Sequence, residues 1–422
     1  MNKNHSANLP TNENSSVGKK QRKPRRRIRL RLGRKTNADV RKNFSENRMY
    51  YEKLADKYYV VRTVMSILLA LWMIIRTVFT YTVVEADGLL YLNKILKINS
   101  ANLDARYNTI SYAGGNGAVF AFYKNDLAVI GEGKITVYDL SGDRNFHEQT
   151  GHSAKAFAVS DKYLALYSPG EKGFSLYNSF SCVYANTFPG SLRAAAVSDS
   201  GKFAVCYKEN EKNIIEVYQK NFKKEFSFSL GEEKIIYSMA LSPNGDKFAL
   251  TTISMKDGVY SSEFTVYDVS SEKIIAEEKT YGKKPIAASF FDNGRIFFAA
   301  EGSLFFYQAN GKKTETIELP SESYTVFCDE NEISLFFGTS YVQGYSSKGA
   351  LLTAFALEER VLSQKVRNGI CYVLSDKTIE IYGKDGANKQ TCAVRSGVKD
   401  FFILDDGSLL ICYITETERI VP

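Results

Sequence analysis

The strongest constraint on the fold is a turn signal that recurs about every 40 residues, each time just ahead of a short apolar run. The copies are FYKNDLAVI (122–130), VSDKYLALY (159–167), VSDSGKFAVCY (197–207), LSPNGDKFAL (241–250), FFDNGRIFFA (290–299), CDENEISLFF (328–337), VRNGICYVL (366–374) and LDDGSLLICY (404–413). The first large apolar residues after these turns are Leu127, Leu164, Phe203, Phe248, Ile296, Ile333, Ile370 and Leu409. Repeats of this length indicate that neighbouring copies of one unit bury a shared core.

A second landmark keeps step with the first. Seven copies contain an alternating strand that ends in tyrosine, at Tyr138, Tyr177, Tyr218, Tyr267, Tyr307, Tyr345 and Tyr382. Alternation with period two predicts strands rather than helices, and polar turns divide each copy into four strands. Four antiparallel strands in about 40 residues are typical of a β-propeller blade. A β-sandwich is the structural alternative, but it gives no reason for two landmarks to stay in phase.

The last copy decides how the ring closes. It supplies three strands, around 401–404, 409–414 and 418–421, and lacks an outer one. We expect the segment between Lys94 and Ile110, which contains the strand-like run LKINS, to add that strand by pairing with the C-terminal end. The sequence therefore predicts an all-β, eight-bladed propeller over 85–422, with seven blades as the alternative if the terminal copy only caps the ring.

An apolar run at 58–84 precedes the repeats. It contains the only tryptophan of the chain, Trp72, and it is long enough for the roughly 20 helical residues that cross a hydrocarbon core. Arg62 and Arg76 lie toward opposite ends, where long side chains reach the headgroups. We expect a transmembrane helix at 58–84. A buried helix of a soluble protein and a cleaved signal peptide are the alternatives.

Charge is divided unequally around this run. Residues 1–57 carry 17 Lys and Arg against five acids, whereas 85–422 carry 36 against 42. Positive charge beside a first span holds that side in the cytoplasm, which predicts a single-pass membrane protein with its N-terminus inside and an extracytoplasmic propeller. The orienting residues are Arg25, Arg26, Arg27, Arg29, Arg31, Arg34 and Lys35.

The part before the span is predicted to have two segments. We expect a basic disordered cytoplasmic head at 1–36 and a cytoplasmic juxtamembrane helix at 37–57, where apolar residues recur with helical spacing. The basic run also resembles a nucleic-acid-binding patch. Orientation beside a span and attraction to anionic lipid already account for it, so membrane lipid is the expected partner and nucleic acid is not.

The strand endings of the type VYD and the NG and DG turns, placed after a single span, resemble a bacterial, mostly Gram-positive family of single-span proteins with an extracytoplasmic β-propeller, grouped as a domain of unknown function. The resemblance covers 58–422. It implies a location and a fold, and it carries no catalytic residues with it. Blade length is also similar to that of WD40 and quinone-dehydrogenase propellers, although the chain has no Trp-Asp dipeptide and no tryptophan after Trp72.

Signals for chemistry are weak. The six cysteines form no CxxC pair, and Cys206, Cys371 and Cys412 occupy matching places in VCY, ICY and ICY, which favours small buried side chains over disulfides. Three histidines are too few for a His-rich metal site. Ser153 beside His152 is a weak sign of a catalytic serine because a triad is spatial. The glycine cluster AGGNG (113–117) precedes no helix, so it predicts no phosphate cradle. We predict no catalytic residue, cofactor or metal.

Binding residues are expected on one face of the ring. In a propeller the A–B and C–D turns share one face, and the B–C turns and blade-to-blade loops share the other. The longest insertions on the second face are 207–213 and 253–262, and loops on a rigid scaffold often carry binding residues. This predicts Tyr260 and Lys256 as partner contacts.

Basic residues also begin the first strands on that face, namely Lys155, Arg193, Lys234, Lys284 and Lys399. A ring of cations at the channel mouth would attract an anionic polymer. Ordinary solvated strand ends are the alternative interpretation.

Together these features predict a non-catalytic, membrane-anchored scaffold that binds a protein or an anionic polymer of the cell envelope. One alternative is an extracytoplasmic, hydrolase-like enzyme with its site at the central channel. Another makes the N-terminal tail the active part, with the propeller as its sensor.

Overall fold

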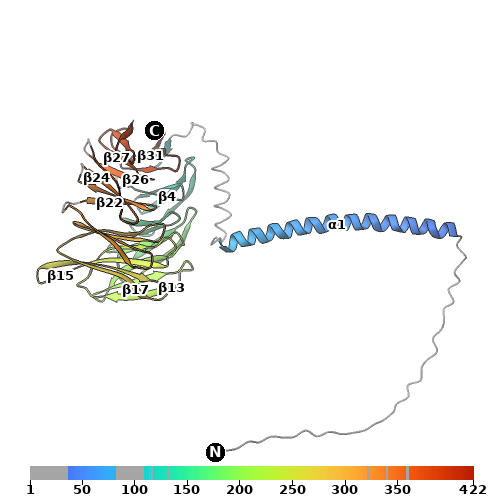
Figure 1. Cartoon of the computed structure of the whole chain (residues 1–422), viewed down its shortest axis with the longest axis horizontal. Coiled ribbons are helices and arrows are strands. Elements are labelled where there is room, and N and C mark those ends of the chain that lie inside the picture. Colours follow the sequence, from blue (N-terminus) through green and yellow to red (C-terminus); the bar gives the residue numbers. More distant parts are fainter. Residues whose placement is uncertain are drawn as a thin grey trace, which may run out of the picture. The chain divides into compact units, whose positions relative to one another are not determined.

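The computed structural model describes residues 37–81, 109–113, 115, 117–131, 133–320, 324–338, 341–357 and 361–422. They form two units that are described separately, the long helix α1 (Asn37–Tyr81) and an all-β ring (Figure 1). Three predictions fall outside the described residues: the disordered head at 1–36, the last part of the span at 82–84, and the strand-like run LKINS.

Helix α1 runs for 45 residues through the predicted boundary at 57/58 without a break. An ion pair of 2.9 Å joins Arg48 and Glu52 one turn apart on its exposed surface. Further along, nine apolar side chains are more than half exposed: Val60, Val61, Met65, Ile67, Leu68, Leu69, Leu71, Trp72 and Met73. Within the described part of the chain, no helical segment has both the length and the apolarity of a membrane-crossing helix.

The first four blades follow one another along the chain, and each is a four-stranded antiparallel sheet. Blade 1 contains β2 (Val119–Tyr123), β3 (Asp126–Gly131), β4 (Lys134–Asp139) and β5 (Arg144–Gln149). Blade 2 contains β6 (Ala156–Val159), β7 (Leu164–Tyr167), β8 (Gly173–Tyr177) and β9 (Cys182–Thr187). Blade 3 contains β10 (Ser191–Val197), β11 (Phe203–Glu209), β12 (Lys212–Tyr218) and β13 (Lys224–Leu230). Blade 4 contains β14 (Ile235–Leu241), β15 (Lys247–Lys256), β16 (Val259–Asp268) and β17 (Lys273–Tyr281).

The next three blades repeat the pattern, and the last one draws strands from both ends of the ring. Blade 5 contains β18 (Pro285–Phe290), β19 (Ile296–Ala300), β20 (Ser303–Tyr307) and β21 (Lys313–Glu318). Blade 6 contains β22 (Tyr324–Asp329), β23 (Glu332–Phe337), β24 (Tyr341–Ser346) and β25 (Leu351–Ala356). Blade 7 contains β26 (Ser363–Arg367), β27 (Ile370–Leu374), β28 (Thr378–Tyr382) and β29 (Asn388–Ala393). Blade 8 contains β30 (Asp400–Ile403), β31 (Leu409–Cys412), β32 (Glu416–Ile420) and β1 (Thr109–Ser111).

The prediction of eight blades is confirmed, and the seven-bladed alternative is wrong. The outer strand of blade 8 is β1, which pairs antiparallel with β32 through Ile110 and Thr417 at its centre. It lies at the very end of the predicted window of 94–110 and extends one residue past it. Closure by pairing of the two chain ends removes the exposed strand edges that an open array would leave.

The core lies between the blades. The second strands are buried on both sides, as in β7 and β19, whereas outer strands such as β5 and β25 are buried only in part. Apolar side chains of the described residues gather in eight clusters, one at each junction between neighbouring blades. Phe264 and Phe298 stack 5.0 Å apart across the junction of blades 4 and 5, and Phe122 and Phe402 stack 5.6 Å apart where blade 8 meets blade 1. The ring is therefore held together by packing between the faces of neighbouring sheets.

The two sequence landmarks face each other inside each sheet. In blade 3, Phe203 lies opposite Tyr218 with their rings stacked 4.8 Å apart. The same apolar-to-tyrosine pairing occurs in blades 1, 2, 4, 5 and 6. In blade 7 the partner of Tyr382 is Cys371, and Ile370 before it pairs with Arg367 at the A–B turn. The first apolar residue after this turn therefore lies one position before the residue that faces the tyrosine.

The cysteines follow the predicted chemistry but not the predicted register. All six are free, and four of them are buried: Cys206, Cys371, Cys392 and Cys412. Cys206 and Cys412 pair with corresponding residues of the first strands. Cys371 lies three positions earlier in its strand, opposite Tyr382. The matching place predicted for Cys371 is therefore wrong, because its blade has a shorter A–B turn.

Candidate functional site

Three of the predicted cations occupy equivalent positions in different blades. Each of these cations directly precedes the first-strand residue that pairs with the equivalent position of the second strand. The cations are Lys155, Arg193 and Lys399, and the pairs that follow them are Ala156↔Tyr167, Ala194↔Cys206 and Asp400↔Cys412. All three side chains are exposed at the start of a first strand, on the face that carries the B–C turns. None of them forms an ion pair with another described residue. They belong to blades 2, 3 and 8.

The other two predicted cations differ from these three. Lys234, ahead of the first strand of blade 4, forms an ion pair with Glu263 that Lys279 shares. Although partial burial acts to raise the pKa of Glu263, the two ammonium groups hold it below its usual range. Lys284 lies directly before β18 and has no ion pair with a described residue. The predicted ring of five cations therefore contains one whose charge is already offset.

In blades 4 and 5 the positions equivalent to Arg193 are apolar or aromatic. The first strands of blades 3, 4 and 5 all bulge at this place, and the bulged residues are Arg193, Tyr237 and Ile286. A bulge turns a side chain out of the regular pleat. The face that carries the B–C turns, named here the B–C face, therefore has a cation at this position in blades 8, 2 and 3 and an apolar or aromatic side chain in blades 4 and 5.

The insertion in blade 4 is not a loop, as the sequence interpretation expected, but a strand extension. Strands β15 and β16 remain paired up to Lys256↔Val259, and Asp257 and Gly258 close a two-residue turn with φ of 53° and 78°. In Figure 1, β15 reaches beyond the neighbouring blades. The insertion in blade 3 is likewise a hairpin, turned at Asn210 and Glu211. Regular pairing gives both extensions a rigidity that loops lack.

The two predicted partner contacts lie at the tip of this blade 4 hairpin. Lys256 is exposed, whereas Tyr260 is partly buried and its hydroxyl donates to the Gly282 carbonyl at 2.7 Å. The Tyr260 side chain therefore fastens the hairpin to the chain just after β17 through this hydrogen bond. The largest exposed apolar side chains at blade 4 on this face are others: Met255, Val259, Tyr281, Ile235 and Tyr237, which are 48 to 70% exposed. The sequence did not identify them because an apolar residue in an alternating strand pattern is predicted to be buried in the core.

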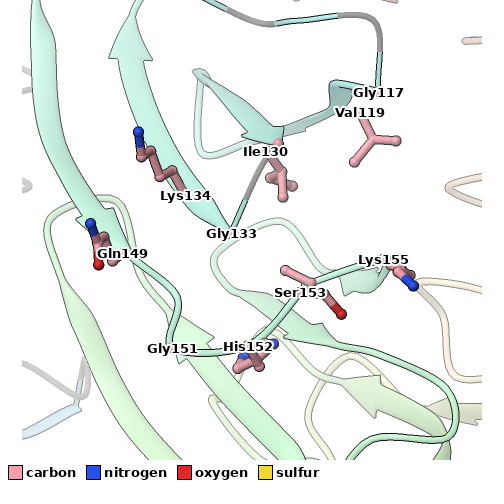
Figure 2. Close-up of a pocket in the computed structure, with 12 residues that line it drawn as sticks. Gly117, Val119, Ile130, Gly133, Lys134, Gln149, Gly151, His152, Ser153 and Lys155 are labelled. Carbon is pink, nitrogen blue, oxygen red and sulfur yellow. The ribbon is translucent and has the colours of Figure 1, made fainter.

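A hollow of about 770 Å³ opens on the B–C face between blades 1 and 2. It is formed by the end of β3 and the start of β4, by Gln149 at the end of β5, and by the loop from Gly151 to Lys155 that leads into blade 2. Figure 2 shows Lys134 and Lys155 on opposite sides, with Ile130 between them and Val119 above. One predicted cation, Lys155, thus belongs to the rim of a cavity.

The polar side chains of this loop are held by blade 2. The Ser153 hydroxyl bonds to the Glu171 carboxylate, and its oxygen lies 2.8 Å from Ser168 Oγ. These hydrogen bonds from Ser153 lower the pKa of Glu171. Nε2 of His152 lies 3.0 Å from Ser175 Oγ, and burial lowers the pKa of this imidazole. The serine and the histidine therefore have separate partners, which gives them structural roles rather than those of a nucleophile and its base.

Sequence comparison places the repeats in a known group. Residues 103–421, about three quarters of the chain, match a family of unknown function, DUF5711. The chain belongs to this family. None of the functionally curated proteins matches the chain.

Solved structures similar to the DUF5711 ring are β-propellers. BamB from Moraxella catarrhalis is 10% identical, with a TM-score of 0.50 over 74% of this chain and 95% of that one. The C-terminal WD40 domain of Sif2 is 11% identical, with the same TM-score over 74% and 94%. Sqt1 of Saccharomyces cerevisiae is 10% identical, again with a TM-score of 0.50, over 75% and 97%. These likenesses confirm the propeller fold.

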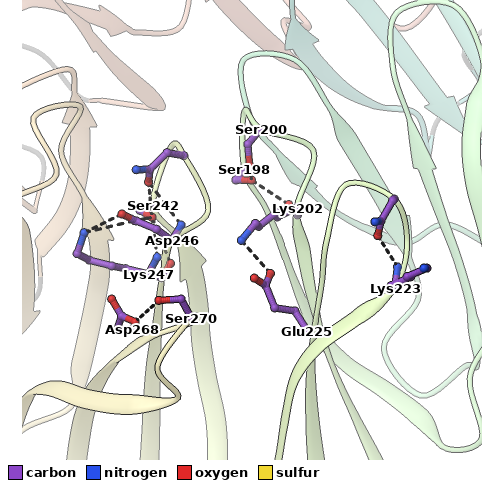
Figure 3. A network of polar contacts seen from close by, with 12 residues as sticks. Ser198, Ser200, Lys202, Lys223, Glu225, Ser242, Asp246, Lys247, Asp268 and Ser270 are labelled. Carbon is purple, nitrogen blue, oxygen red and sulfur yellow. Dashed lines mark hydrogen bonds and ion pairs between the residues drawn. The ribbon is translucent and has the colours of Figure 1, made fainter. Parts of the chain in front are cut away.

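The opposite, A–B face of the DUF5711 ring directs its polar side chains to one another. In blade 4 the Ser242 hydroxyl donates to Asp246 at 2.7 Å and accepts from the Lys247 backbone N–H at 2.9 Å, and in blade 3 Lys202 pairs with Glu225 at 2.8 Å (Figure 3). These contacts hold turns of blades 3 and 4 on the A–B face.

Acidic residues of neighbouring A–B turns also lie close to one another on the A–B face. The Asp161 backbone N–H donates to the Asp199 carboxylate at 2.8 Å across two blades. Removal from water raises the pKa of Asp161, and the carboxylates of Asp199 and Asp292 raise it further. Among the described residues of the DUF5711 chain, no group of three or more His, Cys, Asp or Glu side chains is arranged to hold a metal ion.

Proposed function

We propose that this DUF5711 protein is a membrane-anchored, extracytoplasmic module that binds a protein partner through the apolar part of its B–C face at blade 4. The proposal has two parts, an anchor that sets the location and a surface that sets the partner. The exposed apolar side chains of the blade 4 hairpin are the observation that carries the second part. Each part has its own experiment.

The sequence and the exposure of apolar side chains in α1 both support a membrane anchor. The proposed span at 58–84 extends past the described residues at its C-terminal end. In α1, side chains such as Ile67, Leu69 and Trp72 are more than half exposed, and burying a large apolar side chain away from water is worth about 1.5–3 kcal/mol. A bilayer would cover these side chains, and the 17 basic residues of 1–57 would hold the N-terminal side in the cytoplasm.

Protease added to intact cells is expected to digest the chain after Asp87 and to spare the head. The readout is immunodetection of tags placed at each end, before and after permeabilisation of the cells. As a control, protease added after permeabilisation should remove both tags. Protection of the C-terminal tag in intact cells would contradict the proposed orientation.

The exposed side chains of the blade 4 hairpin indicate the chemistry of the partner. Met255 and Tyr281 are 70% and 67% exposed, and Val259 at the hairpin tip is 53% exposed. By the strand register Val259 and Tyr281 lie on one face of the sheet and Met255 on the other, so the projecting hairpin presents apolar side chains on both of its faces. Exposed apolar side chains on a rigid projection mark interaction sites, and aromatic residues and methionine are enriched in protein–protein interfaces. A polyphosphate would leave these apolar groups without matching contacts, and a polysaccharide could stack on the Tyr281 ring but would leave Met255 and Val259 unmatched. The chemistry therefore favours a protein.

A photo-crosslinking residue in place of Val259 is expected to capture a discrete protein in cells. The substitutions Met255→Glu and Tyr281→Glu in the same chain should abolish the crosslink, because a carboxylate in a desolvated interface costs several kcal/mol. Placing the crosslinker at Leu351, a 55% exposed residue beside a C–D turn on the A–B face, provides the matched control. Crosslinking of carbohydrate from Val259, or equal crosslinking from Leu351, would refute a protein partner at this surface.

A further inference from the structure

The hollow between blades 1 and 2 has a positively charged neighbour. A second cavity of about 240 Å³ lies beside it and shares Gly131 and Lys134 with it. The lining of this second cavity includes Arg144, His147 and Thr136, with Thr136 Oγ1 at 2.8 Å from His147 Nδ1. The described residues that line the two cavities include no Asp or Glu, although Glu132 lies in the sequence between the lining residues Gly131 and Gly133, outside the described residues. Among the described lining residues basic side chains therefore outnumber acidic ones, whereas 85–422 as a whole has six more acidic than basic residues.

The cations of the two cavities are available to a ligand. Lys134 and Lys155 are exposed on the B–C face, whereas Arg144 is exposed at the other end of blade 1, where β5 begins after the C–D turn. No described carboxylate forms an ion pair with any of the three, although Lys155 is close enough to Glu171 to help lower the pKa of that carboxyl. On the B–C face, Arg193 and Lys399 add two more exposed cations in adjoining blades. Clustered like charges raise the local potential and attract an anion. Structural lysines of this ring, such as Lys202 and Lys234, are paired with glutamates instead.

The walls of the larger cavity are fixed before any ligand binds. The Thr150 backbone N–H donates to the Gly133 carbonyl at 2.8 Å, which ties the interblade loop to the B–C turn of blade 1. The His152 ring packs against Gly173, where an added Cβ would lie 2.8 Å from His152 Cβ. At Gly117 and Gly151, by contrast, an added Cβ would meet no atom within 4 Å, so the cavity wall is open at both places. A preformed site loses less entropy on binding than a mobile one.

From these observations we propose that the paired cavities of blade 1 bind an anion with two or more phosphate or carboxylate groups. Lys134 stands between the two cavities and Lys155 at the far side of the larger one, so a ligand must carry more than one negative group to engage both. Lysine ammonium groups act as point charges that accept either kind of oxyanion. The ligand can be a free small molecule or part of a polymer, and this site is separate from the apolar surface of blade 4.

Residue-resolved acetylation of the full-length protein in detergent tests the proposal. The probes are pyrophosphate, citrate and long-chain inorganic polyphosphate, and the rate at which each lysine is acetylated is followed by mass spectrometry. With each probe at about ten times its dissociation constant, we expect acetylation of Lys134 and Lys155 to slow by about tenfold, because a lysine that holds the anion reacts only while the site is empty. Because each lysine is read separately, anion binding by the basic head does not enter the result.

The control is Lys348, an exposed lysine in a C–D turn on the A–B face. In a Lys134→Gln variant, half-protection of Lys155 should need about tenfold more probe, whereas Lys348→Gln should leave it unchanged. Protection by pyrophosphate and citrate would identify a site for free anions, and protection by polyphosphate alone a site for an anionic chain. The proposal would be overturned if every probe slowed acetylation of Lys134, Lys155 and Lys348 by the same factor. It would also be overturned if Lys134→Gln left the probe concentration for half-protection of Lys155 unchanged.

Discussion

Replacing Tyr112 with alanine is expected to lower the free energy of unfolding of the propeller by about 3–5 kcal/mol, the range for a large buried side chain. Tyr112 follows the closing strand β1, and its ring packs between Phe120 and Tyr138 of blade 1, at centroid distances of 5.7 and 6.1 Å. Its hydroxyl lies 2.8 Å from the carbonyl oxygens of Tyr413 and Glu416. One side chain thus ties the N-terminal strand, blade 1 and the C-terminal strands together.

The Tyr112 hydroxyl and ring can be separated by a second variant. Tyr112→Phe keeps the ring packing and leaves buried carbonyl groups without their donor, so it should cost about 1–3 kcal/mol. Tyr281→Ala removes a tyrosine that is 67% exposed, and should cost no more than about 0.5 kcal/mol. Urea denaturation followed by circular dichroism measures all three. If Tyr112→Ala is no more destabilising than Tyr281→Ala, the ring does not close through this contact.

Replacing Gly311 with alanine is expected to destabilise the junction of blades 4 and 5. Gly311 has a φ of 84° in the C–D turn of blade 5, and an added Cβ would lie 2.0 Å from the carbonyl oxygen of Ile275 in blade 4. The strained backbone costs about 1–3 kcal/mol, and the overlap adds about 1–3 kcal/mol more because a backbone atom must move. Thermal unfolding of the purified variant measures the combined loss.

Gly407 offers a matched control for the Gly311 substitution. It has a φ of 80° in a turn with the same hydrogen bonds, since Gly407 N–H donates to Leu404 at 3.0 Å as Gly311 N–H donates to Gln308 at 2.9 Å. An added Cβ at Gly407 meets no atom within 4 Å. Gly407→Ala should therefore show only the backbone cost. Equal losses in the two variants would show that the blades can separate at this junction at little cost.

The order of strands and the number of blades could be predicted because they depend on local chemistry. A turn residue followed by an apolar run, and a tyrosine strand after it, occur wherever a second and a third strand pair, as Phe203 and Tyr218 do. Blade 7 differs in which apolar residue faces the tyrosine. Its A–B turn is as tight as those of blades 1 and 6, but Ile370 occupies the first strand position where those blades have Asp126 and Glu332, so hydrophobicity alone does not distinguish Ile370 from Cys371.

The candidate sites were predicted less completely. Lys155 and Lys256 lie on the expected face, but the residues that give these places their chemistry were not identified in advance. Lys134 is an ordinary strand residue by sequence, and it becomes part of a cavity only because blade 2 packs beside blade 1. Met255 alternates with polar neighbours as a core residue would, yet its hairpin extends past the sheets that would cover it. No pattern within one repeat contains this information.

The sequence by itself determined the repeat, its division into strands, the number of blades and the place of the apolar run, because hydrophobic periodicity and turn chemistry act between residues close in the chain. Only the tertiary structure decided which strand closes the ring, which cations stay unpaired and which apolar side chains remain exposed. Those properties depend on which blades become neighbours. Lys234 meets Glu263 and loses its free charge, whereas Lys155 meets a cavity and keeps it.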